Sequence, residues 1–145
     1  MKPIDYLKAL GVGFATLVIA MAASYPMVGF YAYFIEPGHP QEFYNQSALW
    51  IAPWSSHILG PLVFFAFNYR MARLSPGRNA IAFAVACVVL YTIVDFSTIP
   101  AMGGELRSVF TLKIFSWLLV KLLGALAGAH LGRKNAGTAT DSQIP

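Results

Sequence analysis

The sequence predicts an all-α integral membrane protein with four antiparallel transmembrane helices, and three observations lead to this fold class. Of the 145 residues, 57% are apolar and 11% are charged, whereas soluble domains contain about 25% charged residues. The apolar residues gather in four long stretches, and short connectors rich in proline and glycine separate them. So little charge cannot cover a water-facing surface. The composition therefore excludes a soluble enzyme, a disordered regulator and a nucleic-acid-binding protein.

Each apolar stretch is long enough to cross a bilayer as a helix. The shortest would reach about 31 Å at ~1.5 Å per residue, against a hydrocarbon core of ~30 Å. Helices are expected because a backbone in lipid must satisfy its hydrogen bonds within its own segment. The predicted spans are residues 9–35, 48–69, 79–99 and 111–132.

The connectors and the tail complete the predicted domain. Short connectors make successive helices antiparallel. Residues 1–132 are thus expected to form one four-helix transmembrane domain. Residues 133–145 are polar and are expected to form a disordered cytoplasmic tail. The connectors centre on residues 36–40, 75–78 and 100–104.

Lysine and arginine residues gather on one side of the predicted bundle. The N-terminus, the second connector and the tail hold seven of them, whereas the third connector holds Arg107 and the first holds none. Cytoplasmic loops carry such an excess, so both termini are predicted to be cytoplasmic. The membrane would be a plasma membrane or, in a bacterium, the inner membrane. The net charge of +4 is then a sign of topology and requires no nucleic-acid partner.

The first stretch also resembles a secretory signal peptide. Lys2 and Lys8 precede an apolar run that contains the small-residue pattern Ala20-Met21-Ala22. However, apolar and aromatic residues continue as far as Phe34. A retained helix is therefore the favoured interpretation, with cleavage as the alternative.

The fourth stretch contains a motif for close helix packing. Gly124, Gly128 and Gly132 recur every four residues and form a smooth groove on one helix face. Such a groove admits a partner backbone, because helices in lipid associate through close packing. The partner is either another helix of this chain, which small residues in the first and third stretches favour, or a second copy. The groove also allows docking onto a larger membrane complex.

Ionisable residues inside the spans are the candidates for a functional site, because they avoid lipid and face the bundle interior or water. Counted inward from the outer edge at ~1.5 Å per residue, His57 lies near 14 Å, Lys121 near 15 Å, Tyr91 near 12 Å and Asp95 near 6 Å. These residues come from three helices at similar depths. We therefore predict that they converge on a ligand or proton site, although a Lys121–Asp95 pair would also serve a purely structural role.

Two prolines accompany His57 in the second span. Pro53 removes the hydrogen bond to the carbonyl of Leu49, and Pro61 removes the bond to the carbonyl of His57. A kinked helix with a free carbonyl beside an imidazole is therefore expected near mid-membrane. Broken helices at this depth are common where transporters hold substrates. The alternative is that neighbouring serines and water satisfy the kink.

Cofactor and metal sites find little support in the sequence. His57 and His130 differ by roughly 14 Å in depth, so a haem held by these two histidines is not expected. Glu36, His39 and Glu42 could supply ligands to a cation, but nothing fixes their geometry, and no metal site is predicted. Catalytic motifs are also lacking, so an enzyme is the less favoured interpretation.

Three functions are compatible with these features. The first is a small transporter or ligand-binding bundle with a polar mid-membrane site. The second is an accessory subunit that docks through small-residue helix faces. The third, less favoured, is a membrane enzyme acting on a lipid-soluble substrate. The partners expected are the lipid bilayer and either a second copy or a larger membrane complex.

Overall fold

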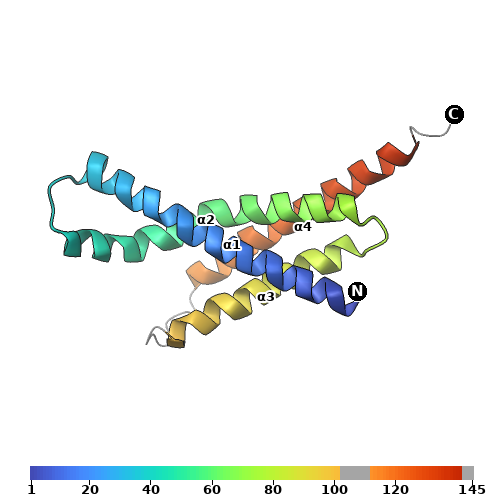
Figure 1. The fold of residues 1–145 in the computed structure, drawn as a ribbon, viewed down its shortest axis with the longest axis horizontal. Helices are drawn as coiled ribbons and strands as arrows, with labels where there is room; N and C mark the ends of the chain where they lie inside the picture. The colour runs from blue at the N-terminus through green and yellow to red at the C-terminus, as the bar shows by residue number, and fades with distance from the viewer. Residues whose placement is uncertain (102–111, 142–145) are drawn as a thin grey trace.

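The computed structural model describes residues 1–101 and 112–141 of the chain (Figure 1). The described residues outside the short connectors and the first two residues are helical. In chain order the elements are α1 (Pro3–Phe30), the π-helical segment η1 (Tyr31–Ile35), α2 (Gln41–Leu74), α3 (Ala80–Ala101) and α4 (Leu112–Asp141).

Four of the described helical segments are long and apolar enough to cross a membrane, as the sequence predicts. The helices nevertheless extend beyond the predicted spans. α2 begins at Gln41 and ends at Leu74, whereas the predicted span is residues 48–69. The reason is that hydropathy marks the part of a helix suited to lipid, while the helix itself continues until a breaker. Here the breakers are Pro40 and the Ser75-Pro76-Gly77 sequence.

The predicted disordered tail is wrong for residues 133–141, which continue α4 as a helix. Proline is lacking between Gly132 and Asp141, so nothing in the sequence blocks the helix backbone there. Asn135 also ties this extension to α2, because its Nδ2 donates a hydrogen bond to the Tyr69 hydroxyl at 3.1 Å. Pro100 and Ala101, which are predicted to begin the third connector, are the last residues of α3. Residues 102–111, which include Arg107, and residues 142–145 lie outside the described residues.

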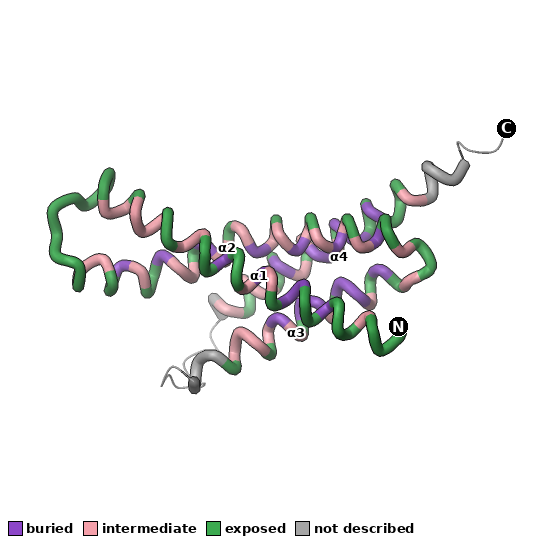
Figure 2. The backbone as a smooth tube through the Cα atoms, in the orientation of Figure 1, coloured by how far each residue is buried: buried purple, intermediate pink, exposed green. Residues whose placement is uncertain are grey.

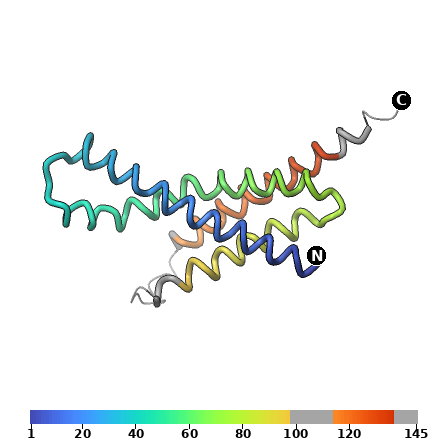
Figure 3. Tube along the Cα trace, in the orientation of Figure 1, coloured from blue at the N-terminus to red at the C-terminus, as the bar shows by residue number. Residues whose placement is uncertain are grey.

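The helices pack in the ring order α1–α2–α4–α3. The most extensive contact joins α2 and α4, followed by the contacts of α1 with α2 and α3, and of α3 with α4. By contrast, α2 and α3 are adjacent in the chain and make few contacts. Figures 1 and 3 show the N-terminus and residues 75–79 at one end of the structure, and Figure 1 shows the C-terminal end of α4 at the same end. We call this end the basic end, because it carries most of the Lys and Arg residues.

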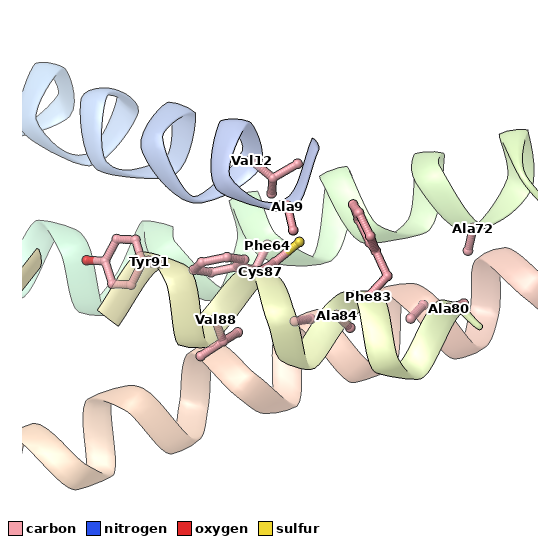
Figure 4. Packing of buried hydrophobic residues seen from close by; sticks show 12 residues of the cluster. Ala9, Val12, Phe64, Ala72, Ala80, Phe83, Ala84, Cys87, Val88 and Tyr91 are labelled. Carbon is pink, nitrogen blue, oxygen red and sulfur yellow. The ribbon is translucent and has the colours of Figure 1, made fainter. Parts of the chain in front are cut away.

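The core lies between the four helices, in the part of the bundle toward the basic end (Figures 2 and 4). Small side chains such as Ala84, Cys87 and Ala125 are completely buried there and allow the helices to approach closely. Larger side chains fill the centre: the Phe64 and Tyr91 rings meet edge to face, with centroids 5.4 Å apart. Cys87 is thus part of the core, as expected for a small apolar residue.

Gly124, Gly128 and Gly132 face the backbone of α2. A Cβ atom added at these positions would overlap with the carbonyl oxygens of Pro61, Phe65 and Tyr69, respectively. The three carbonyls recur every four residues, like the glycines, so the two helices lie in register along this face. The partner of the glycine face in this structure is therefore a helix of the same chain.

The C-terminal half of α1, η1 and the N-terminal half of α2 form a hairpin that projects beyond α3 and α4 (Figures 1 and 2). Its tip, residues 36–40, turns at Gly38, whose φ of +86° favours glycine. The Tyr44 hydroxyl closes the turn by donating to the Glu36 carbonyl at 2.7 Å. His39 Nε2 lies 3.2 Å from Glu36 Oε2. The hairpin exposes large aromatic side chains, as expected for a membrane interface: Tyr25, Phe30, Tyr33, Phe34 and Trp50.

A partly buried ion pair ties α1 to the α2–α3 connector at the basic end. Arg78 Nη1 donates to Asp5 Oδ1 at 3.2 Å, and the side chains of Arg78 and Asp5 are 8% and 13% exposed. Arg78 Nη2 also donates to the Met71 carbonyl at 2.9 Å. The guanidinium carbon lies 4.1 Å from the centroid of the Phe83 ring. One side chain thus joins three segments of the chain.

Replacing Arg78 by lysine should therefore lower the free energy of unfolding by about 1–2 kcal/mol, although the charge is kept. A lysine ammonium cannot donate in the same fork to Asp5 and the Met71 carbonyl. The measurement is thermal unfolding in detergent. Arg70→Lys is the matched control, because Arg70 is exposed on the same end of α2 and should change stability by less than ~0.5 kcal/mol. Equal effects of the two substitutions would contradict the bridging role.

Candidate functional site

A cluster of four polar side chains from three helices forms the candidate site. Lys121 on α4 donates from Nζ to Ser56 Oγ on α2 at 3.0 Å and to the Tyr91 hydroxyl on α3 at 2.9 Å. Ser56 Oγ and the Tyr91 hydroxyl are themselves 3.3 Å apart. The fourth member is Asp95, which lies one helical turn after Tyr91 on α3. We call Ser56, Tyr91, Asp95 and Lys121 the polar cluster.

Asp95 completes the cluster electrostatically. Its carboxylate forms a side-chain hydrogen bond with the Tyr91 hydroxyl and interacts with Lys121 through its charge. The ammonium also lies 4.5 Å from the centroid of the Tyr91 ring, within the range of a cation–π interaction. Lys121 is thereby provided with hydroxyl, aromatic and anionic neighbours. Such neighbours are what a cation needs in order to be buried, and Lys121 is only 4% exposed.

Two glycines make room for the cluster. A Cβ atom at Gly60 would lie 2.8 Å from Lys121 Cε, so the missing side chain lets the lysine stem pass over α2. A Cβ atom added at Gly13 on α1 would lie 3.1 Å from the Tyr91 backbone nitrogen, so the backbones of α1 and α3 approach closely at Tyr91. The positions of Lys121 and Tyr91 therefore depend on glycines in the helices opposite them.

The polar cluster lines a cavity of about 360 Å³ to which all four helices contribute. α1 supplies Leu17, α2 supplies Ala52 and Pro53, and α4 supplies Trp117, among others. Nine of the thirteen lining residues that the structure describes are apolar, and the other four are the polar cluster. Binding sites for small molecules commonly have this composition, with an apolar wall and a few convergent polar groups, in a volume of ~300–1,000 Å³.

Three of the four predicted site residues come together, and His57 takes a different position. Lys121, Tyr91 and Asp95 line the cavity, whereas His57 is not among the described lining residues. Its ring lies against Trp54 and Trp117, with centroid distances of 6.0 and 5.5 Å, and the two tryptophan rings are themselves 6.5 Å apart. His57 Nδ1 is buried and has no hydrogen-bond partner among the described residues. The α2 residue that reaches the cluster is its neighbour Ser56.

The prolines of α2 lie inside a continuous helix. α2 is helical through both Pro53 and Pro61, and Pro53 lines the cavity. Ser55 is completely buried, and its hydroxyl donates to the Ala52 carbonyl at 2.8 Å. The kink and the free His57 carbonyl remain predictions from the chemistry of proline.

Sequence reasoning missed Ser56 and Gly60 as parts of the site. The available signal was position: Ser56 is adjacent to His57 and therefore has nearly the depth predicted for Lys121. Gly60 follows Ser56 by one helical turn and so lies on the same face of α2. A search for small or hydroxyl residues at the depth of a buried lysine would have found both.

The other residues considered for ligands lie apart from the cluster. His130 is exposed on α4, and Glu36 and His39 form a pair at the hairpin tip. Within residues 1–101 and 112–141, no three side chains of His, Cys, Asp or Glu gather in a way that could hold a metal ion. Lys113 is a further ionisable residue within the predicted fourth span, and its side chain lies outside the described side chains.

Comparison of the chain with protein-family models, curated proteins and solved structures gives no match. The site is therefore interpreted from its own geometry. The polar cluster can donate hydrogen bonds from an ammonium and two hydroxyls, and accept them at a carboxylate, beside an apolar wall.

Proposed function

We propose that the chain is a multi-pass membrane protein that binds a small molecule in the cavity beside the polar cluster. The four helices are antiparallel in this proposal, with both termini on the cytoplasmic side. The observation that carries it is the position of Lys121 and Asp95. These buried ionisable side chains border a cavity contributed by all four helices.

The cavity favours a binding role over a purely structural ion pair. Two charged groups in a bilayer are energetically costly, and a pair that only stabilises the fold is best surrounded by packed side chains. Here the pair instead borders about 360 Å³ of space, with apolar side chains opposite. Polar groups exposed to such a space are available to an occupant that completes their hydrogen bonds.

The proposed orientation rests on the basic end. The seven Lys and Arg residues counted for the cytoplasmic side belong to the N-terminal turns of α1, the region from Arg70 to Arg78, and α4 after Gly132. Arg78 forms an ion pair with Asp5. It still counts toward the excess of basic residues, because acidic residues contribute little to the positive-inside rule.

The accessory-subunit alternative loses its main support. That alternative relied on the glycine face of α4 as a docking surface, and α2 covers this face within the chain. No other described feature specifies a protein partner. Ligand binding is therefore the function that we put forward.

The proposal is tested by filling the cavity. Ala52 lines it, and Ala52→Phe should occupy the space without changing the charge. Wild-type protein purified in mild detergent should carry a small-molecule adduct in native mass spectrometry, and Ala52→Phe should lose most of it. Ala22→Phe is the matched control, because Ala22 is exposed on α1, and it should keep the adduct.

Thermal unfolding in the same detergent distinguishes a filled cavity from a misfolded protein. If Ala52→Phe unfolds as cooperatively as Ala22→Phe, the protein is folded, and the adduct was lost because the phenylalanine fills the cavity. A wild-type protein without an adduct, or an adduct that Ala52→Phe retains, would contradict the proposal.

A further inference from the structure

We infer that the molecule bound in this cavity is electrically neutral, mostly apolar, and carries one oxygen-bearing headgroup such as an ester, a ketone or an alcohol. The inference rests on the proposed function, because it concerns the occupant of the same cavity. Two observations carry it: the charge balance of the polar cluster and the apolar nature of the remaining wall.

The charges of the cluster cancel. Among the described lining residues, Lys121 and Asp95 are the two that are ionised in their ordinary state at neutral pH, and they interact through their charges. A ligand with a net charge would add an uncompensated charge to a balanced pair in a medium of low dielectric constant, which is strongly unfavourable. A neutral ligand leaves the balance intact.

The hydrogen bonds of the cluster define the headgroup. Lys121 Nζ donates to the hydroxyls of Ser56 and Tyr91. The Tyr91 hydroxyl gives its one proton to the Asp95 carboxylate, whereas the Ser56 hydroxyl can donate its proton to another acceptor. An acceptor oxygen on the ligand can therefore take a hydrogen bond from the cluster while Lys121 keeps other partners. An apolar molecule without such an oxygen would leave this hydrogen-bond donor of the cluster without an acceptor.

The rest of the wall defines the body of the ligand. The nine other lining residues, which include Leu17, Phe96 and Trp117, present no ionised group. An alkyl chain or ring packed against them stays out of water, and its burial needs no further polar partner. The cavity thus separates a polar end from an apolar remainder.

Trp117 provides the readout, because it lines the cavity. In a chain with Trp50→Phe and Trp54→Phe, Trp117 is the sole tryptophan. This protein is reconstituted in lipid vesicles and titrated with three bromoalkyl quenchers of the same chain length. The quenchers are methyl ω-bromoundecanoate, ω-bromoundecane sulfonate and ω-bromoundecyl trimethylammonium. A chain whose sole tryptophan comes from Leu62→Trp reports quenching from probe dissolved in the lipid, since Leu62 is 61% exposed.

The neutral ester should quench Trp117 saturably, with a half-saturating membrane concentration lower than those of the two charged probes by about tenfold or more. Quenching of the Leu62→Trp reporter should increase without saturation. Tight binding of the sulfonate or the ammonium probe by the wild-type protein would overturn the inference. So would a lack of saturable quenching by the ester. Neither result would remove the adduct that tests the proposed function.

Charge substitutions locate the binding at the cluster. Asp95→Asn leaves Lys121 and should shift the preference toward the sulfonate, whereas Lys121→Met leaves Asp95 and should shift it toward the ammonium probe. The double variant Asp95→Asn/Lys121→Met has no ionised group in the cluster and should retain the preference for the ester. It therefore tests the inference even if one of the single variants folds poorly. Lys134→Gln, an exposed charge change, should leave the order of the probes unchanged. Preferences that do not follow these charges would overturn the inference.

Discussion

Gly128→Ala should lower the free energy of unfolding by about 1–3 kcal/mol, even though alanine is the better helix former. The added Cβ would overlap with the carbonyl oxygen of Phe65. This oxygen belongs to the backbone of α2 and cannot rotate away as a side chain could. Relief therefore requires α2 and α4 to separate, and these two helices make the most extensive contact in the structure.

Gly11→Ala is the matched control for this substitution. Gly11 also lies within a helix, but a Cβ there would meet nothing within 4 Å. It should leave stability unchanged or raise it by up to about 1 kcal/mol, because a helical glycine is replaced by alanine. Thermal or denaturant unfolding in detergent measures both variants. A Gly128→Ala variant as stable as Gly11→Ala would show that α4 does not pack on α2 through this face.

Lys121→Met should lower the free energy of unfolding by about 3–5 kcal/mol, because it leaves the Asp95 carboxylate in the bundle without its cationic neighbour. Asp95→Asn should also be destabilising, because it leaves the ammonium without its anion. The double variant should lose much less than the sum of the two single effects, because it buries no unpaired charge. Unfolding in detergent of the wild type and the three variants gives the coupling free energy.

Lys134→Gln supplies the reference for loss of a lysine charge. Lys134 is exposed on α4, and its removal should change stability by less than about 0.5 kcal/mol. Additive effects of Lys121→Met and Asp95→Asn would contradict the pairing of these two residues. The coupling is expected whether or not a ligand binds, so it tests the polar cluster independently of the proposed function.

Much of the fold could be predicted because apolar length is a one-dimensional property. The four membrane-length helices follow from the number of consecutive apolar residues. The helix ends were less predictable, since α2 extends through polar residues as far as Gln41 and Leu74. The helical residues 133–141 show the same effect: polarity marks where a helix leaves lipid, not where the helix ends.

The candidate site could be predicted in part, for a similar reason. Depth along a helix follows from the rise per residue, so the positions of Lys121 and Tyr91 within their apolar stretches are enough to place them at nearly equal depth. Rotation about the helix axis depends on packing against neighbours. His57 and Ser56 have almost the same depth, yet Ser56 contacts Lys121 and His57 lies against Trp54 and Trp117.

The amino-acid sequence alone determines the class of this protein, its four apolar helices and the scarcity of charge that makes Lys121 and Asp95 conspicuous. Tertiary packing decides which helices are neighbours: α2 packs on α4 and barely on α3, although five residues join α2 to α3. It also decides which side chains meet at the cavity. The physical reason is that hydropathy and helical rise act within one segment, whereas neighbours and rotation depend on the close packing of residues distant in the chain, such as Gly128 against the carbonyl of Phe65.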